Sequence, residues 1–258
     1  YDAQSNAVKS DAFNWSSTLN AALEKTDDQL SFVVSAGDQI QTTKKKSPNK
    51  DASKSEIEYT GYLSPEALKS LPVATTVGNH DADNANYTYH FNRTNASELG
   101  SNKVVGGDYY FKYGNALFIM LNTQDTNVAE HKQFIEQTVA ANKDCKWRIV
   151  TLHQDIYGSG YDHSDSDGMV LRTQLTPLMD KYDIDVVLQG HDHTYSRTYQ
   201  LQGDGQAHDK FTKTENTANY AKENNCYEIV DTTKSGTVVN PKGTIYLEAN
   251  SATGSKFY

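Results

Sequence analysis

Four short apolar segments of this chain each run directly into side chains that can bind a metal ion. Apolar runs of five or six residues predict buried strands. In open α/β sheets, binding sites form at the carboxyl ends of the strands, so we expect the polar side chains to converge. The segments are residues 30–35, 72–77, 147–152 and 184–188, and the side chains are Asp38, Asn79, His80, Asp81, His153, His191, Asp192 and His193.

Helical patterns alternate with these strands, which predicts an α/β fold. In residues 11–25, Trp15, Leu19 and Leu23 recur every four positions and share one helical face. Continuous apolar strands favour sheets that are covered on both faces. The other expected elements are helices at 64–70, 126–141 and 169–182 (with a kink or break at Pro177), a hairpin of 108–113 and 116–122 around Gly114 and Asn115, and a last strand at 244–248.

The polar side chains at the strand ends share one chemistry. Imidazole nitrogen together with carboxylate and amide oxygen suits Zn, Mn or Fe. One His after a strand is more often a hydrogen-bonded structural residue, and one Gly-Asp is usually a turn. The four segments together favour a metal centre. His191 and His193 point the same way on an extended segment, whereas in a turn they can diverge to different ions.

Composition excludes several classes of partner. With 33 acidic and 24 basic residues, the net charge is −9, which opposes bulk electrostatic binding to nucleic acid or to an anionic membrane. The longest apolar run, 116–121, is far too short to be a transmembrane segment. Seventeen Tyr and only three Met suit an extracellular or cell-surface protein.

The ends of the chain and its cysteines support further expectations. The chain starts at Tyr1 without a leader and stops at Tyr258 without an evident signal, so we expect a piece of a longer polypeptide with further domains. Cys145 and Cys226 fit either one disulfide or two unrelated thiols. Because there is no CxxC, a cysteine-based zinc or redox site is not expected.

The series Gly-Asp, Gly-Asn-His-Asp, His and Gly-His-Asp-His resembles the calcineurin-like metallophosphoesterase superfamily, which includes purple acid phosphatases and secreted bacterial phosphoesterases. The resemblance implies an α/β fold of two mixed β-sheets, packed as a sandwich and flanked by helices in four layers. It implies one domain over 1–258, with the first strand upstream or missing and a polar insertion at 202–242.

The same resemblance implies two transition-metal ions (Zn, Mn or Fe) at one edge of the sandwich. Asp38 would bridge the two ions, because each carboxylate oxygen can face one cation. His80 would sit over the phosphate, and Asp81 would either hold its ring or form a turn. Asn79, His153 and His191 would complete one metal site, and His193 would serve the other.

Two positions depart from the superfamily pattern. The opening Asp-x-His has its nearest match in Asp2, Ala3 and Gln4, so Asp2 is either a ligand of the first metal or part of a frayed terminus. The Tyr ligand of purple acid phosphatases is replaced by Gln41. Gln4 or Gln41 would then add a weak oxygen ligand, and we expect this metal site to be the looser one.

The remaining candidates are mostly ordinary features. The Lys-rich residues 44–54 read as a solvated loop, with an anion-binding patch as the alternative. His90 either lines the substrate pocket or lies in a surface loop, and His131 is expected on the surface of a helix. Residues 161–168 are a solvated loop, a lid beside the site or, least favoured, a calcium loop.

The sequence therefore predicts a dinuclear, metal-dependent hydrolase that cleaves a small-molecule phosphate ester with a metal-bound hydroxide. A phosphodiesterase or nucleotidase of the same fold is an alternative. A non-catalytic cell-surface binding module is another, but such a module should lose ligands or His80, and this chain keeps them.

Overall fold

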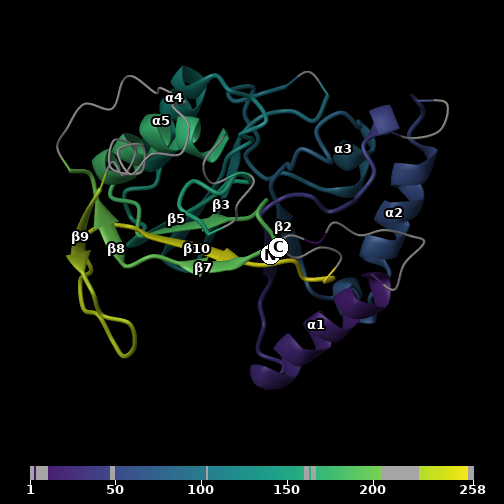
Figure 1. The fold of residues 1–258 in the computed structure, drawn as a ribbon, viewed down its shortest axis with the longest axis horizontal. Coiled ribbons are helices and arrows are strands. Elements are labelled where there is room, and N and C mark those ends of the chain that lie inside the picture. The colour runs from purple at the N-terminus through teal and green to yellow at the C-terminus, as the bar shows by residue number, and fades with distance from the viewer. Residues whose placement is uncertain are drawn as a thin grey trace.

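The fold is described from a computed structural model of the chain (Figure 1). The described residues are 3, 11–46, 50–102, 104–159, 163, 167–204 and 227–254. Asp2, Gln4 and Cys226 therefore lie outside the described residues, as does most of the predicted insertion at 202–242.

The largest sheet of the described residues has six strands in the order β3-β4-β5-β6-β10-β7. Its four central strands are mutually parallel, and the edge strands β3 and β7 are antiparallel to their neighbours. The carboxyl ends of the central strands consequently share one edge. The strands are β3 (Tyr109–Tyr113), β4 (Ala116–Met120), β5 (Trp147–Thr151), β6 (Val186–Gln189), β7 (Tyr195–Arg197) and β10 (Ile245–Ala249).

A second, parallel pair packs against this sheet: β1 (Val33–Ser35) and β2 (Val73–Thr75). Phe32, just before β1, meets the Phe118 ring of β4 edge to face at 5.3 Å. The Thr76 hydroxyl, just after β2, donates to the Leu121 carbonyl at 2.6 Å. These contacts hold the two sheets face to face. A separate antiparallel pair joins β8 (Gln200–Gln202) and β9 (Glu228–Asp231).

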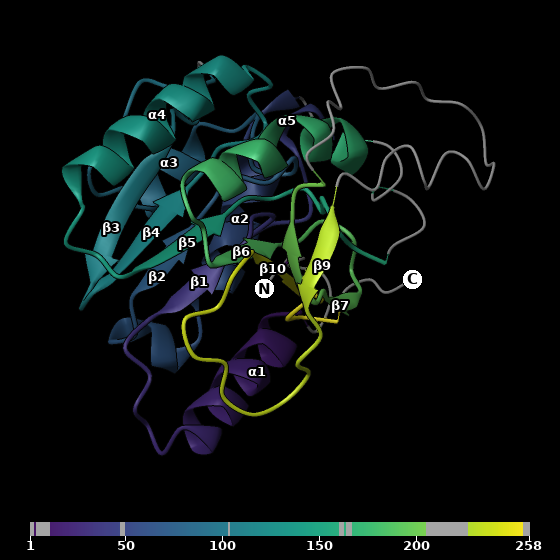
Figure 2. The ribbon, with the colours of Figure 1, turned by 90° about the vertical axis from the view of Figure 1, so that its left-hand side faces the viewer.

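Helices cover both outer faces, which gives four layers (Figure 2). One core lies between the six-stranded sheet and α4 and α5, where Leu117 and Ile119 meet Phe134 and Leu175. The other core lies between β1-β2 and α1 and α2. The helices are α1 (Asp11–Lys25), α2 (Ser53–Leu63), α3 (Asn86–His90), α4 (Val128–Ala141) and α5 (Asp167–Lys181), with 3-10 turns at Lys44–Lys46 and Glu66–Lys69. The predicted α/β class with helix-flanked sheets is confirmed.

The structure differs from the sequence prediction mainly before residue 100. The sequence did not predict α2, because only Tyr59 and Tyr62 mark its buried face among polar neighbours. The predicted helix at 64–70 is a 3-10 turn over Glu66–Lys69. Helix α5 continues through Pro177, where a kink or break was expected.

The prediction that His131 lies on the surface is wrong. His131 is fully buried, and its Nδ1 lies 2.7 Å from Oδ2 of the buried Asp108. Its Nε2 lies 2.9 Å from the Asp125 carbonyl. Both ring nitrogens therefore have partners, and that is what allows a polar ring to occupy the core.

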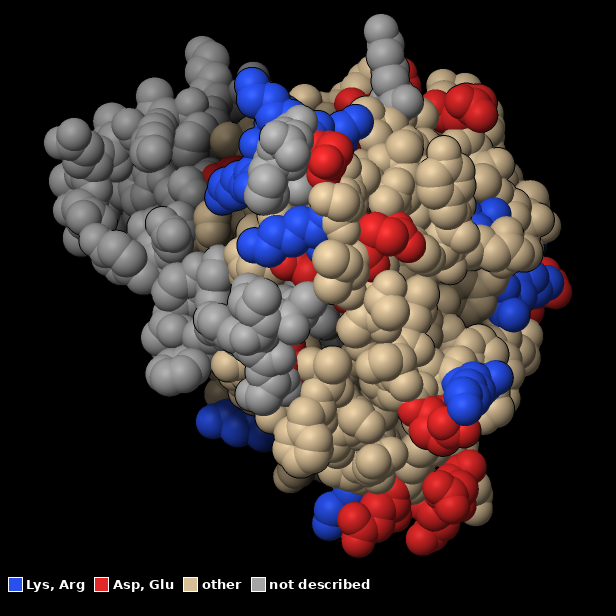
Figure 3. Space-filling model, turned by 90° about the vertical axis from the view of Figure 1, so that its right-hand side faces the viewer, with Lys and Arg blue, Asp and Glu red and all other residues tan. Residues whose placement is uncertain are grey.

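The structure also bears on the cysteines, on membrane-spanning helices and on surface charge. The Cys145 thiol is free and buried in the first core. No helix of the described residues is both long enough and apolar enough to span a membrane. On the face shown in Figure 3, basic and acidic side chains lie close together instead of forming one basic surface.

Candidate metal centre

Polar side chains from both sheets meet at one edge of the sandwich. Asp38 follows β1, His153 follows β5 and His191 follows β6. Each of these residues offers one ligand atom, and the three atoms lie within 4.8 Å of one another. All three residues are buried, with exposures of 0%, 0% and 8%. The structure thus brings together, as a cluster, residues that lie far apart in the sequence.

The backbone around this cluster explains why Gly precedes the polar residues. A Cβ atom on Gly78 would lie 2.0 Å from Oδ1 of Asp38, and a Cβ on Gly37 would lie 2.6 Å from Nδ1 of His153. Asp38 and His191 themselves have positive φ angles of 47° and 78°. Non-glycine residues in this region are strained, and such strain gathers at functional sites.

His153 presents its Nε2 nitrogen to the centre of the cluster. Its Nδ1 lies 2.8 Å from the Ala36 carbonyl, which places the ring proton on Nδ1. Its Nε2 lies 2.9 Å from Oδ1 of Asn79 and 3.5 Å from Oδ2 of Asp38. Burial lowers the pKa of His153 to about 4, despite the opposing charge of Asp38, so the ring is neutral at neutral pH.

This arrangement fits a bound cation. The Nε2 lone pair and the Asn79 and Asp38 oxygens are all acceptors, and they face one point. A divalent transition metal satisfies such a donor set, and the carbonyl behind Nδ1 fixes the ring as it does for metal-ligating histidines. Asn79, whose side chain is exposed, would close this site from the outside.

Asp38 is ionised and held in place. Burial alone would raise the pKa of Asp38, but His153, His80 and His191 outweigh it and lower the pKa. Its Oδ1 accepts the backbone N–H of His80 at 2.8 Å, and its Oδ2 faces the His153 ring. A fixed carboxylate with one oxygen still turned toward the cluster suits a metal ligand.

Asp81 was expected either to hold the His80 ring or to form a turn. The structure places it in the turn, because the two side chains have separate partners. Nδ1 of His80 is held by the Gln41 carbonyl, and its Nε2 lies 3.8 Å from Oδ2 of Asp38. The buried Asp81 instead accepts from the Tyr59 hydroxyl at 3.0 Å and from the N–H groups of Gly78 at 3.1 Å and Gln39 at 3.4 Å. Asp81 therefore braces the turn.

Helix α2 supplies a second brace that the sequence did not reveal. The buried Glu58 accepts the N–H groups of Gln41 at 3.2 Å and Thr42 at 2.7 Å, and the Thr42 hydroxyl at 2.8 Å. Gln41 enters the site through its backbone, because its carbonyl holds the His80 ring. One helix therefore fixes the loops after β1 and β2, through Glu58 and Tyr59.

A second group lies on the open side of His191. Asp167, at the start of α5, lies between two imidazoles, 3.6 Å from Nε2 of His191 and 3.5 Å from Nδ1 of His163. Burial alone would raise the pKa of Asp167, but the two histidines lower it. Both residues fall in segment 161–168, which was expected to be a solvated loop, a lid beside the site or a calcium loop. The i, i+4 spacing of His163 and Asp167 is the sequence feature that could have predicted this pair.

Three further residues were predicted to serve the other metal: His193, Asp2 and Gln4. His193 is buried, at 2% exposure, on the loop that carries His191. Asp2 and Gln4 lie outside the described residues, so the prediction for the other metal stays a prediction. Their neighbour Ala3 is buried, and its carbonyl accepts the Thr253 hydroxyl.

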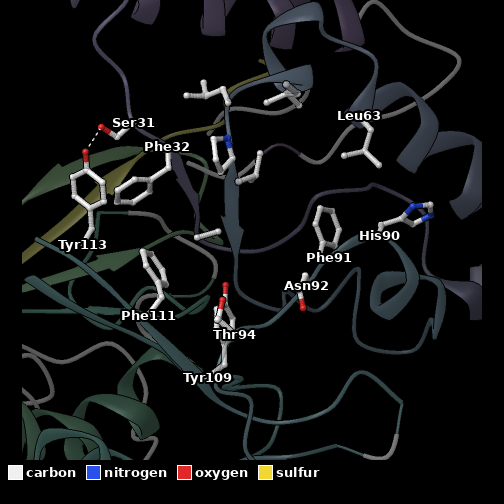
Figure 4. Close-up of a pocket in the computed structure, with 15 residues that line it drawn as sticks. Ser31, Phe32, Leu63, His90, Phe91, Asn92, Thr94, Tyr109, Phe111 and Tyr113 are labelled. Carbon is white, nitrogen blue, oxygen red and sulfur yellow. Dashed lines mark hydrogen bonds between the residues drawn. The ribbon is translucent and has the colours of Figure 1, made fainter. Parts of the chain in front are cut away.

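His90 belongs to a different region. Its Nε2 lies 3.0 Å from the Glu56 carboxylate, and its ring borders an apolar cavity of about 560 Å³ (Figure 4). The cavity is lined by Phe32, which precedes β1, and by Pro72, which precedes β2. Since β1 and β2 are parallel, this cavity lies at the end of the pair opposite to Asp38 and Asn79.

The layered fold and the buried His and Asp cluster define a class of α/β proteins that bind metal at the carboxyl ends of their strands. The family model of the calcineurin-like phosphoesterases matches residues 11–195. The chain belongs to the calcineurin-like phosphoesterase family, as its motifs predicted.

The chain is also similar to individual members. It is 27% identical over 152 residues to purple acid phosphatase 1 of Ipomoea batatas, covering 55% of this chain and 32% of that protein. The structure of a purple acid phosphatase from yellow lupin aligns with a TM-score of 0.53 at 18% identity, covering 91% of this chain and 38% of the other. A dimetal phosphatase from Danio rerio aligns with a TM-score of 0.53 at 11% identity, covering 96% and 80%. The chain spans less than a third of the length of the curated relatives that it matches.

Proposed function

We propose that this protein hydrolyses small-molecule phosphate esters with two transition-metal ions. The observation that carries the proposal is the convergence of Asp38, His153 and His191 at the edge shared by both sheets. Asp38, Asn79, His153 and His191 would hold one ion. The other would take Asp38 and His193, together with Asp2 as predicted from the sequence. Similarity to purple acid phosphatases supports transition metals, with Zn, Mn and Fe as candidates.

The bound ions, His80 and His163 would have different roles in the reaction. When bound, the ions would neutralise charge on the phosphate and make a water molecule more acidic. The Gln41 carbonyl accepts from Nδ1–H of His80 and fixes the ring, so Nε2 of His80 stays near Asp38. When the ring carries both protons, Nε2 can donate a hydrogen bond to a phosphate oxygen. His163, partly exposed beside His191, offers a second imidazole on the open side of the cluster.

Two further expectations remain proposals. We infer an extracellular or cell-surface location from the Tyr-rich, Met-poor composition. Domains beyond this chain are inferred from the greater length of its relatives.

The decisive experiment is hydrolysis of an aryl phosphate monoester and of a bis-aryl phosphate diester, before and after chelation. We expect chelation to abolish hydrolysis and added Zn²⁺ or Mn²⁺ to restore it. His191→Ala should lose both metal and activity. Exposed Asp27→Asn, in the turn after α1, is the matched control and should lose neither. Full activity in metal-free protein would overturn the proposal, and the ratio of the two substrates separates a monoesterase from a diesterase.

A further inference from the structure

Glu248 is a buried acidic residue that the proposed mechanism does not use. It lies on β10, between Gln189 of β6 and Ser196 of β7 in the sheet register, and is 1% exposed. Its Oε2 accepts the Thr194 hydroxyl at 3.1 Å and the Ser196 hydroxyl at 3.4 Å. Thr194 directly follows His193. The carboxyl group is therefore hydrogen-bonded to the segment that leads out of the His191–His193 turn.

The same carboxyl group also reaches the loop after β5. Glu248 contacts the side chain of the fully buried Asp155, which lies two residues beyond His153. Oδ1 of Asp155 accepts from Nε2 of Gln189 at 2.6 Å, and that nitrogen also donates to the Tyr157 carbonyl at 2.8 Å. Asp155 is thus fixed from the β6 side, and Glu248 spans the space between two metal-ligand loops.

A contact between two buried carboxyl groups is favourable only when a proton lies between them. Oε1 of Glu248 has no hydrogen-bond donor among the described residues, so the side chain has a position from which it can itself donate. Burial, and next the charge of Asp155, raise the pKa of Glu248 to about 11, and Asp192 adds to the shift. Glu248 is therefore neutral at physiological pH, a donor to Asp155 and an acceptor from Thr194.

We propose that Glu248 is a positioning residue, whose buried carboxyl group ties the segment after His153 to the segment after His193 and so orders the proposed metal ligands. The inference rests on the proposed function, in that these histidines are taken as the ligands. Positioning is needed because His191 has a φ of 78° and its loop carries that strain. Other links between the two loops are the Gly190 N–H, which donates to the His153 carbonyl at 3.0 Å, and the Ser159 hydroxyl, which donates to the Thr194 hydroxyl at 3.0 Å.

The test compares Glu248→Gln with Glu248→Leu. Gln keeps a neutral donor and acceptor of the same shape, whereas Leu removes both. We expect Glu248→Leu to weaken Zn²⁺ binding, measured by chelator competition, about 10-fold. This is the lower end of the effect of a residue that hydrogen-bonds a ligand directly, because Glu248 acts through Thr194 and Asp155. Glu248→Gln should stay within about threefold of the parent protein, since it retains those hydrogen bonds. The matched control is Glu228→Leu on the exposed face of β9.

A readout without metal separates this inference from the proposed function. In the metal-free protein, amide hydrogen exchange of residues 190–196 should accelerate in Glu248→Leu and not in Glu248→Gln. If the parent protein binds Zn²⁺ but hydrolyses neither phosphate ester, the proposed function fails while the exchange result still decides the role of Glu248. Unchanged exchange in a folded Glu248→Leu overturns the inference, as does equal damage by Gln and Leu.

A milder variant covers the case in which Glu248→Leu does not fold. Thr194→Val removes one hydroxyl donor and should accelerate the same amides less than Glu248→Leu. In the double variant, the two effects should add only in part, because both remove the Thr194–Glu248 hydrogen bond while Thr194→Val also removes the acceptor of the Ser159 hydroxyl. Fully additive effects, or no effect of Thr194→Val on exchange, count against a tie through Thr194.

Discussion

Two buried histidines, each beside a buried aspartate, have pKa values shifted in opposite directions. His131 meets Asp108 under α4, and burial alone would lower the pKa of His131, but the hydrogen bond and charge of Asp108 raise it. His153 meets Asp38 at the metal-binding edge, and burial lowers the pKa of His153 to about 4. Burial next to a carboxylate therefore does not by itself tell a structural histidine from a ligand.

The partners of the second ring nitrogen make the difference. His131 has an acceptor at each nitrogen, Asp108 and the Asp125 carbonyl, so a protonated ring is fully satisfied. His153 has the Ala36 carbonyl at Nδ1, and its Nε2 faces Asn79 and the neighbouring His191 ring. A second cationic ring would repel it. The core pair is thus closed by hydrogen bonds at both ring nitrogens, and the edge pair leaves Nε2 of His153 facing the proposed metal position.

The largest expected effect is that of Asp38→Asn. Loss of a carboxylate that holds the ions should reduce hydrolysis by at least about 10³-fold, since metal ions supply several kcal/mol of transition-state stabilisation. Asp108→Asn should keep metal content and activity per folded molecule. Metal analysis and turnover of both variants test this contrast, and an active Asp38→Asn protein would remove the distinction between the two pairs.

Next in size is the stability loss in His131→Ala. Removing the ring leaves the Asp108 carboxylate buried without its charged partner, which costs about 3–5 kcal/mol in comparable pairs. Denaturant unfolding of the metal-free protein measures the loss. The matched control is His90→Ala, whose partner Glu56 is partly exposed and should be stabilised by water instead. A loss below that of the control would mean that Asp108 is protonated in the core.

The pH dependence of stability should separate the two pairs by sign. The raised pKa of His131 gives stability that is present below the unfolded pKa of about 6.5 and is lost as pH rises through the folded value. The lowered pKa of His153 gives stability that is lost as pH falls from about 6.5 toward 4, at most about 3 kcal/mol. In unfolding experiments compared with the parent, metal-free His131→Gln should lose a fall in stability with rising pH above about 6.5, and His153→Gln should lose a rise in stability with rising pH below about 6.5. Slopes that change together would contradict the assignment.

A smaller effect is expected at the brace beneath the site. Tyr59→Phe deletes the hydroxyl that donates to Asp81 and leaves its two backbone donors in place. Burial raises the pKa of Asp81 well above its usual range, so the loss is that of an ordinary buried hydrogen bond, about 0.5–1.5 kcal/mol. We expect lower stability with the metal ligands still present, so metal content should hold while the unfolding midpoint falls. If metal content falls first, the brace sets ligand geometry directly.

Sequence patterns predicted the parts of this molecule that repeat a regular period or end a strand. The helix at 11–25 and the strands before Asp38, His153 and His191 were visible because apolar residues mark them. Helix α2 was missed because its buried face is built from Tyr and Glu side chains that read as polar. The roles of Glu58, Asp81 and Glu248 depend on contacts between distant segments, which no local pattern contains.

His131 and His163 also show that local sequence does not determine where a histidine lies. Each is a single His among polar neighbours, and local sequence favoured an exposed position for both. One lies in the core because Asp108 is there to receive it, and the other lies beside His191 because α5 begins at that edge. The environment of a histidine depends on the elements packed against it. Sequence alone could therefore identify candidate histidines, but could not tell structural ones from those beside the metal site.

The smallest effect is expected for Gln41→Ala. Gln41 stands where purple acid phosphatases have a tyrosine ligand, so this variant tests whether its side chain takes part in the metal-binding edge. Its N–H donates to Glu58 and its carbonyl holds the His80 ring, whereas its side chain makes no hydrogen bond with any described residue. Alanine preserves both backbone groups, so Zn²⁺ affinity and turnover should change by no more than about twofold, well under 1 kcal/mol. The iron-loaded parent should also lack the strong visible band of a tyrosinate ligand. Titration of Zn²⁺ into metal-free Gln41→Ala is the measurement: a selective weakening of one of two sites would show that the amide oxygen is a ligand after all.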